Sequence, residues 1–207
     1  MDDRVVITFI RHGLTKENLE KRYIGWSNPS LCRKGILELK EKTYPKTPDI
    51  VFSSDLNRSV ETAKLIYPNA KPKLLKELRE MNFGQFEGKT YEELKHNEHY
   101  QKWVNHPFQI TPPEGESYIT FQKRVQQAWE KMVRTLENLA VKQIVCISHG
   151  GTIRELLTQH GPNNLTFWDY SMKHGDILSL VGKRDEVRRK KRCILLQEGP
   201  LTESEIG

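Results

Sequence analysis

Two histidines, each followed by glycine, stand directly after apolar runs of the sequence. His12 follows the run 5–10, with Arg11 before it, and His149 follows the run 144–147. Apolar runs of this length, bounded by glycine, are typical of buried strands. In an open α/β sheet, ligands collect at the carboxyl ends of the strands. Two histidines and an arginine at two such ends indicate a single site, and their charge suits an anion.

The residues after His12 are suited to binding phosphate. Gly13 lets the backbone approach a ligand closely, and Thr15 suits the N-cap of a helix. A helix N-terminus presents unpaired N–H groups and the positive end of its dipole, which favours phosphate. Asn18 lies one turn further on, where its amide can donate. Taken alone, the motif also fits a surface Arg–His pair beside an ordinary helix cap.

Arg58 belongs to a second polar cluster, 53–62, which also follows a short apolar run. From the first turn of a helix, its guanidinium could reach back over the strand end and bind two phosphate oxygens. The alternative is a surface arginine that pairs with Glu61, three residues along the same helix. The cluster by itself favours that surface pair.

Glu80 opens a third segment, 80–88, in which glycines and aromatic residues alternate. A carboxyl group beside apolar rings tends toward its protonated form and can then donate a proton. The alternative is a capped loop with two solvated glutamates. The stretch 84–90 is one residue short of a nucleotide-binding phosphate loop and follows no strand, so we expect no nucleotide there.

Three weaker candidates are expected to be structural. His96 and His99 are three residues apart, but no third ligand has metal spacing, so a solvated helix face and no metal are expected. Cys146 lies inside an apolar run, where a cysteine behaves as a small inert hydrophobe. Tryptophans are expected to pack in the core or in loops: Trp103, Trp129 and Trp168.

The whole chain alternates between strand and helix patterns. The strands are expected at 4–10, 49–53, 73–75, 143–148, 176–181 and 192–197. The helices are expected at 15–22, 33–43, 55–66, 90–104, 117–140 and 151–160, with a proline-rich loop at 106–117. This order predicts an α/β fold, a three-layer α/β/α sandwich with a mostly parallel sheet.

The helix predicted at 117–140 has the clearest amphipathic pattern. Its apolar residues recur at helical spacing and predict one face turned to the core. They are Phe121, Val125, Ala128, Trp129, Met132, Val133, Leu136 and Leu139.

Length and composition fit a single domain over residues 1–207, with a frayed tail at 198–207. The chain is 36% hydrophobic and 29% charged. No apolar stretch approaches the roughly 18–20 residues that span a bilayer, and no signal peptide is evident. Three cysteines, odd in number and widely spaced, favour a reducing compartment. We therefore expect a cytoplasmic protein with no membrane association.

The net charge of +6 is concentrated near the end of the chain, where residues 183–192 hold seven basic and two acidic side chains. Such a run could bind nucleic acid or an anionic surface. It could equally form a solvated hairpin turn between two late strands, whose cations protect a sheet edge. No aromatic residues interleave with the charges, so we expect the hairpin and no nucleic acid.

Taken together, the motifs resemble the histidine phosphatase (phosphoglycerate mutase-like) superfamily. The resemblance rests on four segments in one order: 11–15, the helix start that holds Arg58, Glu80 before Phe83 and Gly84, and 148–151. It extends from the first strand to about residue 155.

The residues that follow the first histidine narrow this resemblance. The pattern of Thr15 and Asn18 is similar to the mutase and small-molecule phosphatase branch, and differs from the acid phosphatase and phytase branch. One segment departs from the family, because Cys32 stands where threonine is usual in Leu-Thr-x-x-Gly. We expect that change to affect a helix cap and to leave the chemistry unchanged.

The resemblance implies a role for each site residue, without metal or cofactor. His12 would be the nucleophile that becomes phosphorylated, in its neutral form, with its other N–H donating to a backbone carbonyl. Glu80 would protonate the leaving oxygen and then activate water. The phosphoryl oxygens would be held by Arg11, Arg58 and a protonated His149, with Asn18 and the backbone of Gly150.

The expected activity is that of a phosphomonoesterase for a small phosphorylated metabolite. Cofactor-dependent phosphoglycerate mutases are usually longer between the Glu80 motif and the second histidine, so a mutase is the alternative. A non-catalytic module that binds a phosphorylated ligand is a second one. The segments 23–27 and 83–88 resemble the subgroup of alpha-ribazole and broad-specificity phosphatases. Neither segment identifies a substrate, and the oligomeric state stays open.

Overall fold

A six-stranded sheet forms the centre of the computed structural model, which describes residues 3–162, 165–189, 191–193 and 195–198. The strand order is β3-β2-β4-β1-β5-β6. The bounds are β1 (Arg4–Arg11), β2 (Ile50–Ser54), β3 (Lys73–Leu75), β4 (Gln143–Ser148), β5 (Ile177–Lys183) and β6 (Leu195–Glu198). Neighbours from β3 to β1 run parallel, whereas β5 is antiparallel to β1 and β6 to β5.

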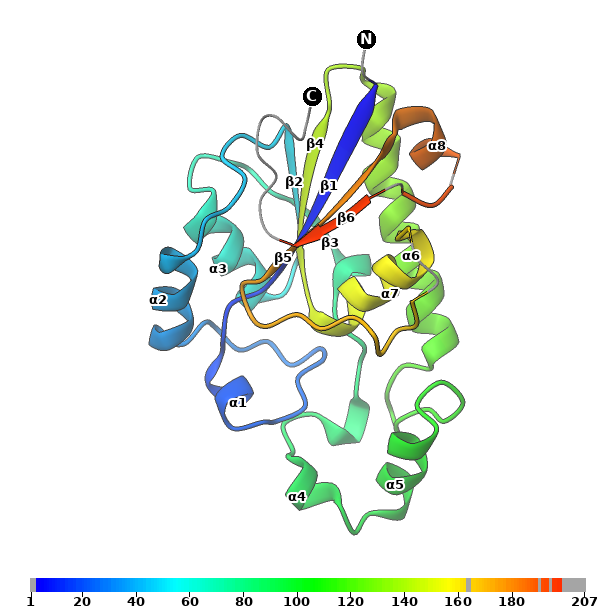
Figure 1. Cartoon of the computed structure of the whole chain (residues 1–207). Coiled ribbons are helices and arrows are strands. Elements are labelled where there is room, and N and C mark those ends of the chain that lie inside the picture. The colour runs from blue at the N-terminus through cyan, green and yellow to red at the C-terminus, as the bar shows by residue number, and fades with distance from the viewer. Residues whose placement is uncertain (1–2, 163–164, 190, 194, 199–207) are drawn as a thin grey trace.

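Helices cover both faces of the sheet, which confirms the predicted three-layer sandwich (Figure 1). One face carries α2 (Arg33–Glu41) and α3 (Asn57–Ile66); the other carries α6 (Tyr118–Arg134) and α7 (Gly150–His160). The short helices α1 (Lys16–Leu19), α4 (Tyr91–Leu94) and α5 (Glu98–Asn105) lie beyond the carboxyl ends of the parallel strands. Short 3₁₀ turns occupy Lys76–Leu78, Gly84–Phe86 and Thr135–Glu137.

The core on either side of the sheet follows from the alternation of side chains along β1. Val5, Ile7 and Phe9 pack in the larger core with α6 and α7, whereas Ile10 packs in a second core with Ala63 of α3. Successive strand residues point to opposite faces, so a nearly continuous apolar run is buried on both.

The pairing of β1 with β4 brings the two histidine motifs together. Arg11, the last residue of β1, pairs with Ser148, the last residue of β4. The N–H of His12 then donates to the carbonyl of Ser148 at 2.9 Å. Two parallel strands that end in register place the next residue of each, His12 and His149, at the same point of the sheet edge.

Three of the predicted helices are divided or shorter than expected. The stretch 90–104 is divided into α4 and α5, because the side chain of Asn97 accepts from the N–H of Tyr100 at 2.9 Å and starts a new helix there. The helix predicted at 15–22 is a single turn, α1.

The helix predicted at 117–140 ends early, at Arg134, and continues only as a 3₁₀ turn. The carbonyls of Leu136 and Val141 bind the guanidinium of Arg184 at 2.8 and 2.9 Å, so they are directed away from a helix axis. Leu139, expected on the apolar face, is 73% exposed. The other residues predicted on this face are buried.

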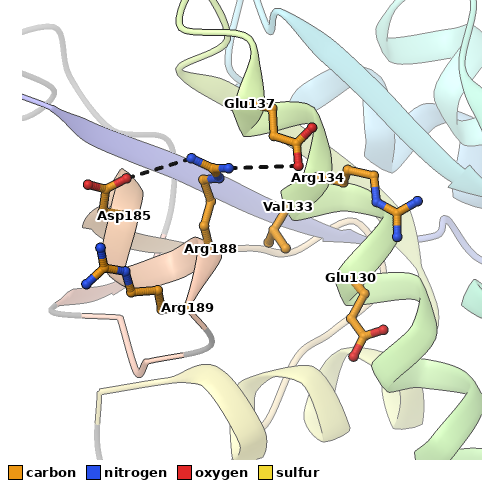
Figure 2. A pocket seen from close by; sticks show the side chains of 7 residues that line it. All are labelled: Glu130, Val133, Arg134, Glu137, Asp185, Arg188 and Arg189. Carbon is orange, nitrogen blue, oxygen red and sulfur yellow. Dashed lines mark ion pairs between the residues drawn. The ribbon is translucent and has the colours of Figure 1, made fainter.

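The basic segment 183–192 forms α8 (Arg184–Arg188) instead of a simple hairpin turn. Only part of its charge is solvated, since Arg184 is buried. Figure 2 shows Arg188 between Glu137 and Asp185, each 3.8 Å away, in a cavity of about 500 Å³ that also exposes Glu130 and Arg134. This cavity combines charges of both signs and contains none of the predicted site residues.

The remaining expectations concern the end of the chain and the membrane. Glu198, placed in the frayed tail, pairs with Leu178 as the last residue of β6; residues 199–207 lie outside the described residues. Among the described helices, none combines the length and apolar character needed to cross a bilayer.

Candidate active site

His12 and His149 form the centre of the site, with ring centroids 5.0 Å apart. Both side chains are buried, at 4% and 0% exposure. The alternative of a surface Arg–His pair is therefore wrong. The matched ends of β1 and β4 hold both rings by backbone pairing, so their separation does not depend on a mobile loop.

The orientation of His12 leaves one ring nitrogen free to react. Nδ1 lies 2.7 Å from the carbonyl of Gly13, which can only accept, so Nδ1 carries the proton and Nε2 the lone pair. Burial, followed by the charge of Arg58, lowers the pKa of His12 well below its ordinary value. The ring is therefore neutral at physiological pH, as a nucleophile requires.

The chain after His12 forms the expected cap. Thr15 accepts from the N–H of Asn18 at 3.2 Å, and the amide oxygen of Asn18 accepts from the N–H of Thr15 at 3.1 Å. This capping box fixes the side chain of Asn18 at the wall of the site. Cys32 caps α2 through its sulfur, 3.4 Å from the N–H of Gly35, so the departure at this position keeps the cap.

Arg58 is buried and reaches the second histidine. Its Nε donates to Nδ1 of His149 at 3.2 Å, and its Nη atoms donate to the carbonyls of Ser27 and Gly25 at 2.8 and 2.7 Å. Burial lowers the pKa of Arg58 to about 10, which leaves it cationic at neutral pH. The alternative of a surface pair is wrong, because Glu61 instead accepts from the backbone N–H of Leu31 at 2.7 Å.

His149 is neutral in this structure, whereas the expectation of a protonated ring concerns the state that holds a phosphoryl group. The Nε of Arg58 can only donate, so Nδ1 of His149 accepts. Nε2 then carries the proton and lies 2.9 Å from Oγ of Ser54. Burial and the neighbouring charge of Arg58 lower the pKa of His149 well below its ordinary value.

The two glycines after His149 leave room for charged groups. A Cβ at Gly150 would lie 3.2 Å from the guanidinium carbon of Arg11. A Cβ at Gly151 would lie 2.5 Å from Oε1 of Glu80, closer than any real contact. The His-Gly-Gly sequence thus brings an arginine and a carboxylate against the first turn of α7.

Glu80 is 9% exposed and is held by backbone donors. Its carboxylate accepts from the N–H of Met81 at 3.0 Å and from that of Gly151, at the start of α7, at 2.8 Å. Glu87 accepts from the N–H groups of Trp26 and Ser27 at 2.8 and 2.9 Å. The alternative of two solvated glutamates is therefore wrong.

Arg11 lies at the rim of the site. Its Nη1 donates to the carbonyl of Met172 at 2.6 Å, while its buried Nε has no hydrogen-bond partner among the described residues. Burial lowers its pKa from the ordinary value. A cation with an unused donor beside Gly150 is suited to holding an anion.

A cavity of about 470 Å³ opens beside these residues. Of the predicted site residues, Arg11, Asn18, Glu80 and Gly150 line it. The buried His12, Arg58 and His149 contact one another and are not part of its lining. Most of the remaining wall is apolar and comes from residues 81–121 and 167–168. The site thus joins a cationic end to an apolar chamber.

The tryptophans divide between the core and this cavity. Trp129 is fully buried, as expected. Trp103 is buried in a small cluster with Phe86, Leu94 and Tyr100, and it also lines the cavity. Trp168 is 59% exposed, packs in its loop 4.9 Å from the ring of Phe167, and lines the cavity as well.

His174 was missed by the sequence interpretation. Its ring centroid lies 5.2 Å from that of His12, and its buried Nε2 has no partner among the described residues. Burial, with the charge of Arg11 next, lowers its pKa to about 3. His174 precedes β5, whose start meets the end of β1 because the two strands are antiparallel. A strand parallel to β1 would instead begin at the opposite edge of the sheet, so a mostly parallel sheet gave no reason to include His174 in the site.

The weaker histidine and cysteine candidates lie outside the site. Cys146 is fully buried in β4, and burial raises the pKa of its thiol. His96 lies in the turn after α4 and His99 on α5, and both are exposed. Among the described residues, no group of three or more histidine, cysteine or acidic side chains could hold a metal ion.

The chain belongs to the histidine phosphatase superfamily (branch 1), whose family model matches residues 7–192. It is 29% identical to the adenosylcobalamin/alpha-ribazole phosphatase of Escherichia coli over 72% of this chain and 76% of that protein. It is 30% identical to a 2,3-bisphosphoglycerate-dependent phosphoglycerate mutase of Gloeobacter violaceus over 74% of each. The crystal structure of the alpha-ribazole phosphatase from Shigella flexneri matches with a TM-score of 0.74 and 26% identity, over 85% of this chain and 90% of that one.

These findings confirm the resemblance, the fold and the class of protein. The chain is an enzyme of the phosphatase type with a phosphoglycerate mutase-like fold, and its reaction is of the phosphatase or mutase kind.

Proposed function

We propose that the protein is a metal-independent phosphomonoesterase that acts on a small phosphorylated metabolite through a phosphohistidine on His12. The observation that carries the proposal is the neutral, oriented ring of His12, with Nδ1 on the carbonyl of Gly13 and cations on either side. A single catalytic domain is supported by strands from both ends of the chain, β1 and β6, in one sheet. The buried free thiols of Cys146 and Cys193 are consistent with the cytoplasm.

In the first step, the lone pair on Nε2 of His12 forms a bond to phosphorus while the bond to the leaving oxygen breaks. The leaving oxygen takes the electron pair of that bond and a proton from Glu80. The hydrogen bond from Nδ1 to the carbonyl of Gly13 supports the positive charge that the ring acquires. The phosphoryl group moves in line through a loose transition state, so positioning and charge stabilisation provide most of the catalysis.

The cationic end of the cavity binds the three phosphoryl oxygens. Arg11 supplies its unpartnered Nε, and Arg58 supplies a buried charge. Gly150 is the first residue of α7, so its N–H has no partner within the helix and points toward an anion. Asn18 uses its amide oxygen in the capping box, which leaves its NH₂ group to donate. This arrangement supplies positive charge from arginines and a helix end, the role that a metal ion has elsewhere.

The charge of the phosphoryl group also changes the protonation of His149. A dianionic phosphoryl group beside it raises the pKa of the imidazole, because the opposite charge favours the protonated ring. Protonation at Nδ1 requires Arg58 to release this nitrogen and turn its Nε–H to the phosphoryl group. Arrival of the substrate thus replaces a contact between two site residues with contacts to the phosphoryl oxygens.

In the second step, water breaks the phosphohistidine. The carboxylate of Glu80 takes a proton from water, the water oxygen bonds to phosphorus, and the electron pair of the P–N bond returns to Nε2 of His12. The products are an alcohol and inorganic phosphate, and the enzyme returns to its first state. In a mutase, a substrate hydroxyl would replace water. This alternative is kept open by the 30% identity to the Gloeobacter violaceus mutase.

The test is turnover of p-nitrophenyl phosphate with EDTA present, together with labelling by a ³²P phosphomonoester. We expect metal-independent turnover and a base-stable, acid-labile phosphoenzyme in the wild type, and neither in His12→Ala. A labelled phosphoenzyme in His12→Ala would contradict the assigned nucleophile. Phosphoryl transfer that depends on 2,3-bisphosphoglycerate would indicate the mutase, and binding of phosphate without turnover the non-catalytic module.

A further inference from the structure

Arg154 is a second cationic feature of the cavity, separate from the residues that hold the phosphoryl group. It lies on α7, one helical turn after Gly150, and lines the same cavity. A helix rises about 1.5 Å per residue, so its backbone is about 6 Å further along the wall. Arg154 therefore belongs to the part of the cavity wall that follows the first turn of α7.

The guanidinium of Arg154 is held in place. Its Nε donates to the carbonyl of Tyr170 at 2.9 Å. Its central carbon lies over the rings of Phe167 and Trp168, at 5.8 Å from each centroid. A guanidinium fixed through Nε and two rings keeps its Nη groups for another partner, and a planar fork of this kind matches a carboxylate or phosphate.

No carboxylate forms an ion pair with Arg154 in the part of the chain that the structure describes. Arg22, another arginine of the cavity wall, differs in this respect, because Glu20 and Glu93 pair with it at 2.7 and 3.0 Å. Arg11 already belongs to the phosphoryl site. Arg154 is thus the uncompensated charge of the chamber.

The rest of the chamber around Arg154 favours a flat apolar group. Its aromatic residues include Phe83, Trp103, Phe108, Tyr118, Phe167 and Trp168. Phe108 contacts both walls, with ring centroids 4.5 Å from Tyr118 and 6.0 Å from Trp168. Aromatic walls pack best against planar groups through offset or edge-to-face contacts.

We propose that Arg154 is a specificity-determining residue that binds an anionic group carried by the leaving alcohol. The substrate class is then a phosphomonoester of a planar, largely apolar alcohol with an acidic substituent about one helical turn from the phosphoryl group. The proposal rests on the phosphomonoesterase function above. It adds that the enzyme recognises the alcohol through charge as well as shape.

The experiment compares two aryl phosphates of nearly equal shape, 4-carboxyphenyl phosphate and the neutral 4-carbamoylphenyl phosphate. The readout is the ratio of their kcat/KM values within one enzyme preparation, so that a loss of folded protein cancels. We expect the wild type to favour the carboxylate by about 10- to 100-fold, as a hydrogen bond to a charged group implies. The carbamoyl compound has the better leaving group, so chemistry alone would favour the opposite order.

Three variants separate charge from packing. Arg154→Met should lower the ratio to one or below, mainly through KM, and Arg154→Lys should keep part of the preference. Arg154→Glu should disfavour the carboxylate and give the cationic 4-(aminomethyl)phenyl phosphate the highest kcat/KM of the three compounds. Arg22→Met, at a paired arginine of the same wall, should retain the wild-type ratio.

Two results would overturn the proposal. A wild-type ratio at or below one would mean that the chamber does not recognise the anion. An unchanged ratio in Arg154→Met would mean that another residue does, or that Arg154 only stacks on the aromatic ring. If the wild type hydrolyses neither compound nor p-nitrophenyl phosphate, the phosphomonoesterase function itself fails, which is a different result from hydrolysis without preference.

Discussion

Two buried arginines at opposite ends of the sheet show how similar burial serves different ends. Arg184, near the start of β1, donates to four backbone carbonyls and pairs with Asp3 at 2.7 Å. Arg58, at the carboxyl ends of the strands, donates to two carbonyls and to the ring of His149. No carboxylate pairs with Arg58 among the described residues.

The difference lies in how the charge is balanced. Arg184 is surrounded by carbonyls and a carboxylate of the fold, so its donors are satisfied and it holds these segments together. Arg58, in contrast, donates to the neutral imidazole of His149 and lies close to Arg11, so its positive charge is available to a ligand. Burial of an arginine is therefore uninformative by itself, and the partner of each N–H distinguishes the two roles.

The largest effect on activity is expected from Arg58→Met, which removes the buried cation that has no carboxylate partner among the described residues. We expect kcat for p-nitrophenyl phosphate to fall by about 10²–10³-fold, as for loss of one preorganised donor to a developing anion. Steady-state kinetics measure this fall, and thermal unfolding shows that the variant is folded. A kcat within a few-fold of the wild type would remove Arg58 from the phosphoryl site.

Arg184→Met should give the opposite pattern. It leaves several carbonyls and the carboxylate of Asp3 without their donor, so we expect the free energy of unfolding to fall by about 2–4 kcal/mol. At a temperature where the variant is folded, kcat should stay within twofold of the wild type. Urea unfolding and kinetics on the same sample check both statements, and a large loss of kcat in folded protein would contradict the comparison.

A third prediction concerns pH. The pKa values of His12, His149 and His174 are lowered in the folded protein, chiefly by burial. Below about pH 6.5 the unfolded chain therefore binds more protons than the folded one, and stability falls as pH falls. Each histidine contributes up to about 1.4 kcal/mol per pH unit in that range.

Activity should not follow this fall in stability. Since His12 is neutral well below pH 6.5, its phosphorylation by an aryl phosphate with an acidic leaving group should be nearly constant from pH 7.5 to 5.5. Rapid-quench labelling measures that rate, and denaturant unfolding at the same pH values measures stability. An inflection of the labelling rate near pH 6.5 would show that His12 titrates normally.

The parallel half of the fold was predictable from local sequence. The runs that become β1 and β4, and the caps at Thr15 and Cys32, are encoded by neighbouring residues. The antiparallel pairing of β5 with β1 depends on contacts distant in sequence, and His174 was missed for that reason. The end of α6 was also mispredicted, because it depends on Arg184, about fifty residues away.

In the candidate site, the residues were predictable from the sequence, whereas some of their contacts were not. Residue types and order suggested that His12, Glu80, Arg58 and His149 converge, and the structure brings them together. The contact in which Nδ1 of His149 accepts from Arg58 was not predictable, because it depends on rotamers inside a closed core. The position of Arg154 over two aromatic rings depends on the loop 166–172, which has no periodic pattern.

The matched ends of β1 and β4 have a consequence for how such an enzyme can diversify. A shift of one residue between these strands would turn every side chain to the other face, so the distance from His12 to His149 cannot be adjusted gradually. The chamber wall, in contrast, comes mainly from residues 81–121 and 167–168, outside both strands. Substitutions in that wall can change which ligand fits the chamber while His12 and His149 keep their places, so the proposed reaction centre is compatible with many different chambers.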